Sequence, residues 1–484
     1  MTGEEVTDMP ADTAADGSPL DALVREACAL RFEHLPPNVV ALAEQGVLDT
    51  LGVALAGRAS DVSGVLDRAL LVHTSPASDS AASDSPAPPA EPGSVAVWGA
   101  GRRTDPATAT LLNATAGHAL DYDDWAPGSG AHPSVTLVPT LLAVAELRAG
   151  KHGPLTGRDL ITAYVGGYEL QERIGLAISP SHYEIGFHTT AIVGTLGAAV
   201  AATLALGGTE AEVRTALKIA ATEAAGLKSL FGSMGKPLHA GRASSAGLLA
   251  AQLALAGFEE PGNDTIFGEQ GFVRTHSHEV TVDAALSPFG SPWYVEANLF
   301  KFFPSCFGTH AAIAAAQQLR REPGFDAGLI TGIRLTVPPI VEKVCAIENP
   351  TSGLEAKFSL AYSTAVALLT GEAGLAAFSE PFAPAADVMA LARSLTLDYD
   401  DSFSKTRTVL HVSQSDLDTP LEADVDAGVQ RWVDSPAEQQ ADLESKFFEL
   451  VTPGIGAAAA HLLRDSVMSL PECNDVRALV ALLG

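Results

Sequence analysis

The chain has 484 residues and a formal net charge of −29, because 29 Lys and Arg face 58 Asp and Glu. At roughly 100–200 residues per domain the length allows several domains, and a field of this sign makes nucleic acid and membrane surfaces poor partners. The four cysteines form no CxxC pair, which argues against a disulfide framework or a zinc site and fits a reducing cytoplasm.

In chain order, the acidic segment 1–18 lacks the basic start of a signal peptide and predicts a disordered tail. Helical periodicity begins near Pro19 and recurs through Val39–Arg58, and residues 73–93 are rich in Pro and Ser, which predicts a mobile surface loop. Helical segments with short Gly- or Pro-marked connectors then follow one another, as in antiparallel helical neighbours: Pro106–Ala119, Val135–Arg148, Gly157–Leu176, Thr189–Leu206, Glu210–Ala224 and Pro237–Ala256.

One apolar stretch, Thr189–Gly208, approaches the roughly 20 uncharged residues that span a membrane. Its Thr, Gly and Ala content is poorly hydrophobic for lipid, and it has no basic flank. The stretch therefore predicts a buried helix that packs through small residues.

Past Gly257 the pattern changes to short strands separated by helices. Strands are predicted at Ile333–Val337, Leu395–Tyr399, Thr406–Val412 and Leu421–Val425, and helices at Thr309–Leu319 and Ser359–Leu369. After Ala427 the pattern is helical again, at Glu438–Leu450 and Gly456–Leu463. The predicted fold class is mainly α with α+β: a large all-helical domain built from both chain ends (19–262 and 427–484) and an inserted smaller α+β lid domain (263–426).

The densest titratable cluster lies between His118 and His132, where three of four successive positions are Asp121, Asp123 and Asp124. Alternating aspartates are able to hold Mg²⁺. In acid–base chemistry, Asp121 would orient His132, whose unperturbed pKa of about 6.5 suits proton transfer. Solvated acids at a helix end would show the same spacing, so the pattern alone leaves these readings open.

A second stretch, Gly232–Arg242, places Lys236, His239 and Arg242 within seven residues at a helix start marked by Pro237. Free backbone N–H groups and the helix dipole add to these cations, which favours a cradle for a carboxylate or phosphate. Because a proline follows the lysine, the spacing is not that of a P-loop. An ordinary basic helix start is the alternative.

Two further stretches carry single candidates. Lys301 and Cys306 lie in KFFPSCFGTH, where the lysine suits carboxylate binding and the cysteine is a nucleophile or, more simply, an inert buried thiol. His188 heads the apolar helix at Thr189 and, taken alone, is a structural histidine.

Six blocks in this order resemble the MmgE/PrpD family, whose members include 2-methylcitrate dehydratase, cis-aconitate decarboxylase and iminodisuccinate epimerase. The blocks are AGHALDYDD with HPSVTLVPTLLAVAE, GYELQERIG, GFHTTAIVGTLGAAVAA, GSMGKPLHAGRASSAGLLAAQLALAGF, KFFPSCFGTHAAIAAA and EAKFSLAYSTAVALL. The resemblance implies a cofactor-free, metal-independent homodimer with its active site between a helical domain and a lid.

Matched positions imply roles for individual residues. His132 would be the general acid/base, Asp121 its orienting partner, and Lys236 the carboxylate anchor or proton donor. The remaining substrate-binding candidates are His188, His239, Arg242, Lys301, Cys306, Tyr362 and Trp125. Trp125 and Cys306 depart from the family pattern and would reshape the pocket.

We therefore expect a cofactor-independent lyase, a dehydratase or a decarboxylase, that transfers a proton at a carbon next to a carboxylate of a citrate- or aconitate-like acid. An epimerase or isomerase of an imino- or amino-dicarboxylate is the alternative. A metal-dependent helical synthase would need a second metal motif and an aromatic-lined cavity, and aromatic residues make up 6% of the chain. A non-catalytic scaffold would tolerate replacement of His132 and Lys236.

Overall fold

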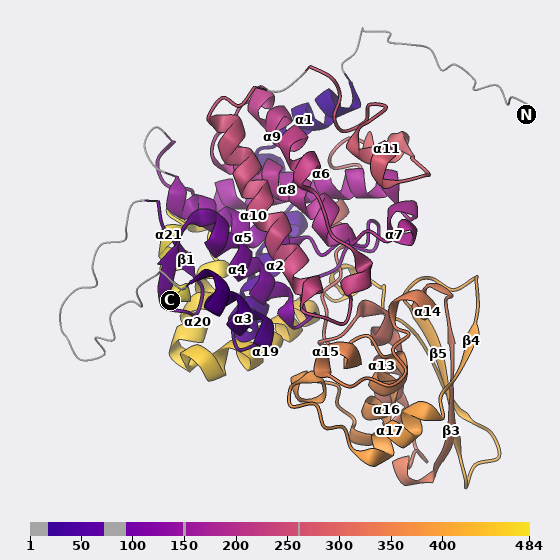
Figure 1. Ribbon diagram of the computed structural model, residues 1–484. Coiled ribbons are helices and arrows are strands. Elements are labelled where there is room, and N and C mark those ends of the chain that lie inside the picture. Colours follow the sequence, from indigo (N-terminus) through magenta and orange to yellow (C-terminus); the bar gives the residue numbers. More distant parts are fainter. Residues whose placement is uncertain (1–17, 72–92, 149–151, 260–261) are drawn as a thin grey trace, which may run out of the picture.

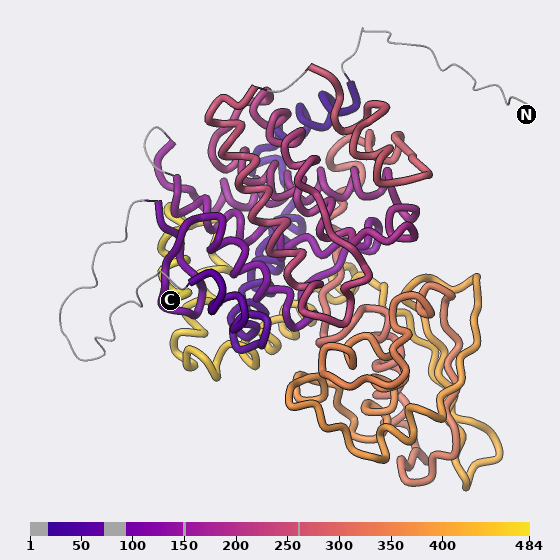
Figure 2. The backbone as a smooth tube through the Cα atoms, viewed as in Figure 1, coloured from indigo at the N-terminus to yellow at the C-terminus, as the bar shows by residue number. Residues whose placement is uncertain are grey.

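The computed structural model describes residues 18–71, 93–148, 152–259 and 262–484. Except for Ser18 and Gly93, the predicted tail 1–18 and loop 73–93 lie outside these residues. A large helical region and a smaller region with a sheet lie side by side (Figure 1), and the chain leaves the large region once and returns to it (Figure 2). This arrangement confirms the predicted fold class of mainly α with α+β.

The large region combines helices from both ends of the chain with the short hairpin β1 (Val95–Val97) and β2 (Arg102–Thr104). The helices predicted between residues 105 and 258 are observed with ends that differ by at most two residues. The helices of this region are α1 (Pro19–Ala29), α2 (Pro37–Gly57), α3 (Asp61–Leu70), α4 (Pro106–Ala119), α5 (Ser134–Leu147), α6 (Gly157–Ile178), α7 (Ser181–Ile185), α8 (Thr189–Ala205), α9 (Glu210–Glu223), α10 (Gly235–Leu255), α11 (Phe272–His276), α12 (Val282–Ala285), α18 (Arg431–Asp434), α19 (Pro436–Ile455), α20 (Ala457–Val467) and α21 (Arg477–Val480).

Helix α8 is the central helix of this region and packs against α5, α6, α9 and α10. Small residues set the close approach: a Cβ on Gly247 of α10 would lie 2.5 Å from the Cβ of Ala198, and a Cβ on Gly167 of α6 would lie 2.7 Å from the carbonyl of Gly197. Every face of α8 is therefore buried, which explains its uniformly apolar sequence.

Among the described residues one helix, α2, is long and apolar enough to cross a membrane. Its most apolar window is 78% buried inside the protein, and it packs against α4 and α19. Core helices of large proteins have the same composition.

The smaller region contains a four-stranded sheet of order β4–β3–β5–β6. Strand β3 is parallel to β4 and antiparallel to β5, and β5 is antiparallel to β6. Alternate residues of β5 are buried under α13, which also packs against α16; the helices cover one face of the sheet (Figure 1). The elements are β3 (Ile330–Val337), β4 (Thr396–Tyr399), β5 (Arg407–Gln414), β6 (Leu421–Asp426), α13 (His310–Leu319), α14 (Ile340–Val344), α15 (Gly353–Ala356), α16 (Leu360–Thr370) and α17 (Ala386–Arg393).

The segment 263–300, which the change of pattern past Gly257 assigned to the smaller domain, packs with the large region. Ile266 and Phe272 belong to the apolar cluster of α6 and α8, and Phe300 belongs to the cluster of α2 and α5. Phe303 is the first residue after this segment that packs against the core of the smaller region. These apolar side chains lack the periodicity of a long helix, so the sequence pattern did not reveal which core they join.

Candidate active site

A cavity of about 140 Å³ lies between the two regions. The large region contributes Trp125, His132, His188, Phe231, Lys236 and Lys301 to its lining, among others, and the smaller region contributes Cys306, Phe307, Ile340, Val341, Val344, Phe358 and Lys405. Residues far apart in the sequence therefore meet at one hollow, as an active site between two domains requires.

Asp121 occupies a left-handed backbone conformation directly after α4. Its φ is +51°, a value that suits Asp better than most residues, and it is the single non-glycine residue with positive φ in the described part of the chain. Its Oδ1 accepts hydrogen bonds from Lys236 Nζ at 2.6 Å and from Lys301 Nζ at 2.7 Å. One buried carboxylate thus pairs with two buried ammonium groups.

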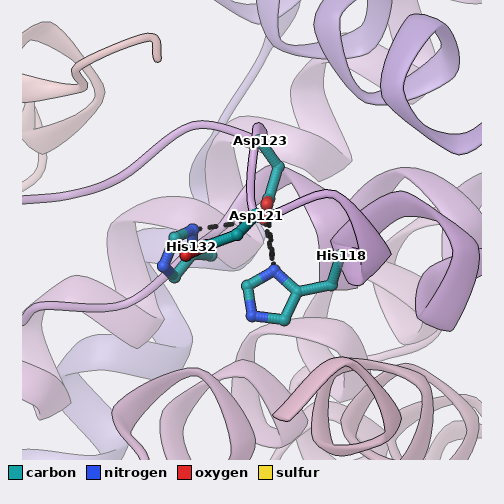
Figure 3. Close-up of side chains that lie close together, drawn as sticks. All are labelled: His118, Asp121, Asp123 and His132. Atoms are coloured by element: carbon teal, nitrogen blue, oxygen red, sulfur yellow. Dashed lines mark hydrogen bonds and ion pairs between the residues drawn. The ribbon is translucent and has the colours of Figure 1, made fainter. Parts of the chain in front are cut away.

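Asp123 faces two histidines (Figure 3). His118 Nδ1 lies 2.8 Å from Asp123 Oδ2, and His132 Nδ1 lies 3.2 Å from the same oxygen. The His132 contact is not aligned as a hydrogen bond, so His132 Nδ1, like Asp121 Oδ2 and His118 Nε2, is a buried atom without a hydrogen-bond partner in the described structure. The sequence assigned Asp121 as the partner of His132; in the structure Asp123 holds that place.

Burial and neighbouring charge set the ionisation of the cluster. Burial opposes charge on both acids, but Lys236 and Lys301 hold the pKa of Asp121 well below its usual value, and the two histidines do the same for Asp123. Burial lowers the pKa of His132 to about 3, although Asp123 opposes this shift. At neutral pH the acids are charged and this imidazole is neutral.

His188 and His239 lie beside this cluster. The two Nδ1 atoms are 3.1 Å apart, and the ring of Phe231 packs edge-on against His188 with centroids 5.0 Å apart. Burial lowers the pKa of His239 to about 4 and that of His188 well below its usual value. His188 lines the cavity, whereas His239 contacts His188 and is not among the lining residues.

Of the remaining candidates, Trp125 and Cys306 line the cavity and Tyr362 does not. Trp125 lines the cavity and stacks on Phe307 with centroids 4.7 Å apart, and Cys306 lines it next to Cys345. The neighbouring thiol of Cys345 lowers the pKa of Cys306. Tyr362 lies in the core of the smaller region, where its hydroxyl donates to the carbonyl of Ala377 at 2.6 Å.

Arg242 lies away from the cavity and is exposed on α10. At 3.6 residues per turn, His239 is about 60° around the helix from Lys236, whereas Arg242 is about 120° from it. Lys236 and His239 are accordingly buried, and Arg242 is exposed to solvent. The helix therefore separates Arg242 from Lys236 and His239, although the three residues are close in the sequence.

Two buried lysines near the site, Lys357 and Lys446, were not predicted from the sequence. Lys357 of the smaller region donates to the carbonyl of Leu120, directly before Asp121, and burial lowers its pKa to about 7. Lys446 of α19 donates to Asp49 Oδ1 at 2.6 Å and to the carbonyls of Tyr122 and Lys301 at 2.6 and 2.8 Å. Lys357 lies in EAKFSLAY, the block that first suggested Tyr362, whereas nothing in the sequence distinguishes Lys446.

The four residues of Figure 3 each offer a metal-ligating atom, and these atoms all lie within 4.8 Å of one another. The donor types suit a divalent cation. However, two ammonium groups already neutralise Asp121, and a metal ion beside them would meet like charge at close range. The arrangement therefore favours an ion-pair network over a metal centre.

Two family models cover most of the chain: the MmgE/PrpD N-terminal domain matches residues 21–284 and the MmgE/PrpD C-terminal domain matches residues 303–470. The chain belongs to the MmgE/PrpD family. The C-terminal match begins at Phe303, the same residue at which the chain starts to pack against the core of the smaller region.

Curated relatives of this MmgE/PrpD protein are similar over nearly their whole lengths. Human cis-aconitate decarboxylase is 28% identical over 94% of this chain and 92% of its own. Cis-aconitate decarboxylase of Aspergillus terreus (strain NIH 2624) is 26% identical over 81% of this chain and 84% of its own. The cis-aconitate decarboxylase-like protein oryM of Aspergillus oryzae is 26% identical over 98% and 99%. With the family match, these relatives identify the chain as a lyase.

Proposed function

We propose that the protein decarboxylates cis-aconitate or a closely related unsaturated polycarboxylate. The observation that carries this proposal is the pairing of Lys236 and Lys301 on one buried carboxylate beside His132, at the cavity between the regions. The relatives named as cis-aconitate decarboxylases support the same reaction class.

The two lysines differ in how firmly they are held. Lys301 Nζ donates to both Oδ1 and the backbone carbonyl of Asp121, whereas Lys236 Nζ donates to Oδ1 alone among the described residues. Lys236 therefore turns more easily toward a bound carboxylate, and Lys301 keeps Asp121 in place. We assign Lys236 as the substrate anchor.

In the proposed reaction the bond from the substrate's chain to one carboxylate carbon breaks, and carbon dioxide leaves. The electron pair remains on the chain and delocalises toward the neighbouring carboxylate, where the ammonium group of Lys236 stabilises the developing charge. A bound polyanion raises the pKa of nearby His132, because an opposite charge favours the protonated form. His132 then donates the proton that completes the product.

The test is proton NMR of the enzyme with cis-aconitate in D₂O. We expect loss of carbon dioxide with incorporation of one solvent deuterium. Lys236→Ala should slow turnover by about 10²–10³ or more, whereas Lys343→Ala, an exposed lysine on α14, should leave turnover unchanged.

Other outcomes would contradict the proposal. Turnover of citrate or 2-methylcitrate with release of water, and none of cis-aconitate, would indicate a dehydratase. Deuterium uptake into an imino-dicarboxylate without net reaction would indicate an isomerase. Full activity of Lys236→Ala would remove the lysine from the mechanism.

A further inference from the structure

The cavity has a polar end and an apolar wall. The polar end includes the lysine pair with His132 and His188, and further polar residues of the large region also line the cavity: Ser129, Ser179, His182, Tyr183 and Glu184. The wall belongs to the smaller region and is formed largely by α14, which lies where that region faces the large one (Figure 1). A substrate in this cavity contacts both.

The polar end offers little free positive charge. Both of its lysines are paired with Asp121, and none of the described residues that line the cavity is an arginine. Burial keeps His132 and His188 neutral by lowering the pKa of each. Lys405 adds a further cation, but its side chain is exposed. A bare tricarboxylate would therefore find few free cations for its three carboxylates here, which weakens its binding because an unpaired buried charge is costly.

The apolar wall is continuous. Ile340 and Val341 lie on the same side of α14 as Val344, because they precede it by four and three positions, and all three line the cavity. The stacked rings of Trp125 and Phe307 extend this lining. Glu342 and Lys343, the other two residues of α14, are exposed to solvent. The helix thus presents only aliphatic carbon to the bound molecule.

We propose that the preferred substrate carries an alkyl substituent larger than methyl on its polycarboxylate chain, and that this substituent lies against Ile340, Val341 and Val344. The inference rests on the proposed function, because it names the substrate class of the same cavity. The carboxylate that takes up the developing charge stays with Lys236. The alkyl substituent lies where a site for a bare tricarboxylate would need a further cation.

Burial of one methylene contributes about 0.8 kcal/mol, which corresponds to roughly fourfold in a rate or binding constant. We therefore expect kcat/KM to rise about fourfold for each added carbon until the wall is covered. The measurement is the kcat/KM of the full-length enzyme for cis-aconitate and for its methyl-, ethyl- and propyl-substituted analogues.

The wall is tested by a substitution and a matched control. Val344→Phe places a larger side chain in the space that the alkyl substituent would occupy. It should therefore lower the ratio of kcat/KM for the propyl analogue to kcat/KM for cis-aconitate by about tenfold or more, which is the effect of losing contact with two methylenes. Val433→Phe on α18, where Val433 is 60% exposed and does not line the cavity, should leave this ratio unchanged. The chain-length series on the unmodified enzyme needs no variant to fold.

The outcomes separate this inference from the proposed function. If cis-aconitate is decarboxylated and each added carbon lowers kcat/KM, the alkyl substituent is refuted while the decarboxylase stands. If neither cis-aconitate nor any analogue loses carbon dioxide, both fail. A rise with chain length that Val344→Phe does not reduce would place the substituent elsewhere and overturn the assignment of α14.

Discussion

Replacement of Asp121 by asparagine tests whether one carboxylate neutralises two buried lysines. The side chains of Asp121, Lys236 and Lys301 are 4%, 6% and 1% exposed, and the substitution keeps the shape of the side chain while it removes its charge. Loss of one partner from a buried ion pair costs about 3–5 kcal/mol, because the remaining charge is buried without compensation. We expect a loss of this size in the free energy of unfolding at pH 7.

The pH dependence distinguishes this mechanism from a general packing defect. In the native protein Asp121 outweighs burial and raises the pKa of Lys301, so the contribution of the pair is fully present from pH 7 to 9. In Asp121→Asn the largest charge that opposes burial is gone, although Asp123 still acts to raise the pKa of Lys301. We expect burial then to lower this pKa below its unfolded value of about 10.4. The unfolded variant then binds more protons, so its stability rises with pH and the difference from the native protein narrows.

The assay is urea unfolding at pH 7.0 and 9.5, compared through midpoint shifts at equal slope. Asp398→Asn is the matched control, since Asp398 pairs with Arg334 at 3.5 Å with both side chains more than half exposed; its loss should be about 0–1 kcal/mol. A difference below about 1 kcal/mol for Asp121→Asn, or one that stays constant with pH, would refute the pairing.

Three further predictions concern pH, metal and packing. Because burial lowers the pKa of Lys357 to about 7, the native protein should gain stability relative to Lys357→Met as pH rises from 7 to 10, measured by urea unfolding; a constant difference would contradict this. Dialysis against EDTA should leave turnover of cis-aconitate unchanged in the NMR assay, since ammonium groups already neutralise the acid of the site; activity restored by an added cation would contradict it. Gly247→Ala should destabilise the protein by about 1–3 kcal/mol, since its Cβ would lie 2.5 Å from that of Ala198, whereas Gly454→Ala, with nothing within 4 Å, should stabilise it slightly; equal effects in thermal melts would refute the close packing of α8.

Much of the fold follows from periodicity. The helices between residues 105 and 258 and the four strands of the smaller sheet were predicted close to their observed ends, because each pattern depends on neighbours within one or two turns. The helices predicted at Glu438–Leu450 and Gly456–Leu463 continue to Ile455 and Val467. The segment 263–300 was assigned to the other domain, since its apolar residues have no regular spacing and their partners lie in α6 and α2. Tyr362 lies in one of the sequence blocks that resemble the family, but its side chain does not line the cavity. It packs in the core of the smaller region instead.

The sequence by itself determined the order of the elements, the membership of the MmgE/PrpD family and the residue types available for chemistry. Tertiary structure decided which of them meet. Asp121 pairs with lysines 115 and 180 positions away, His132 faces Asp123, and Lys357 reaches the carbonyl before Asp121 from the other region. Side-chain spacing along one helix or strand is fixed by local geometry, whereas contacts between distant segments depend on how whole elements pack. Burial and neighbouring charge in those contacts then set the pKa of each group.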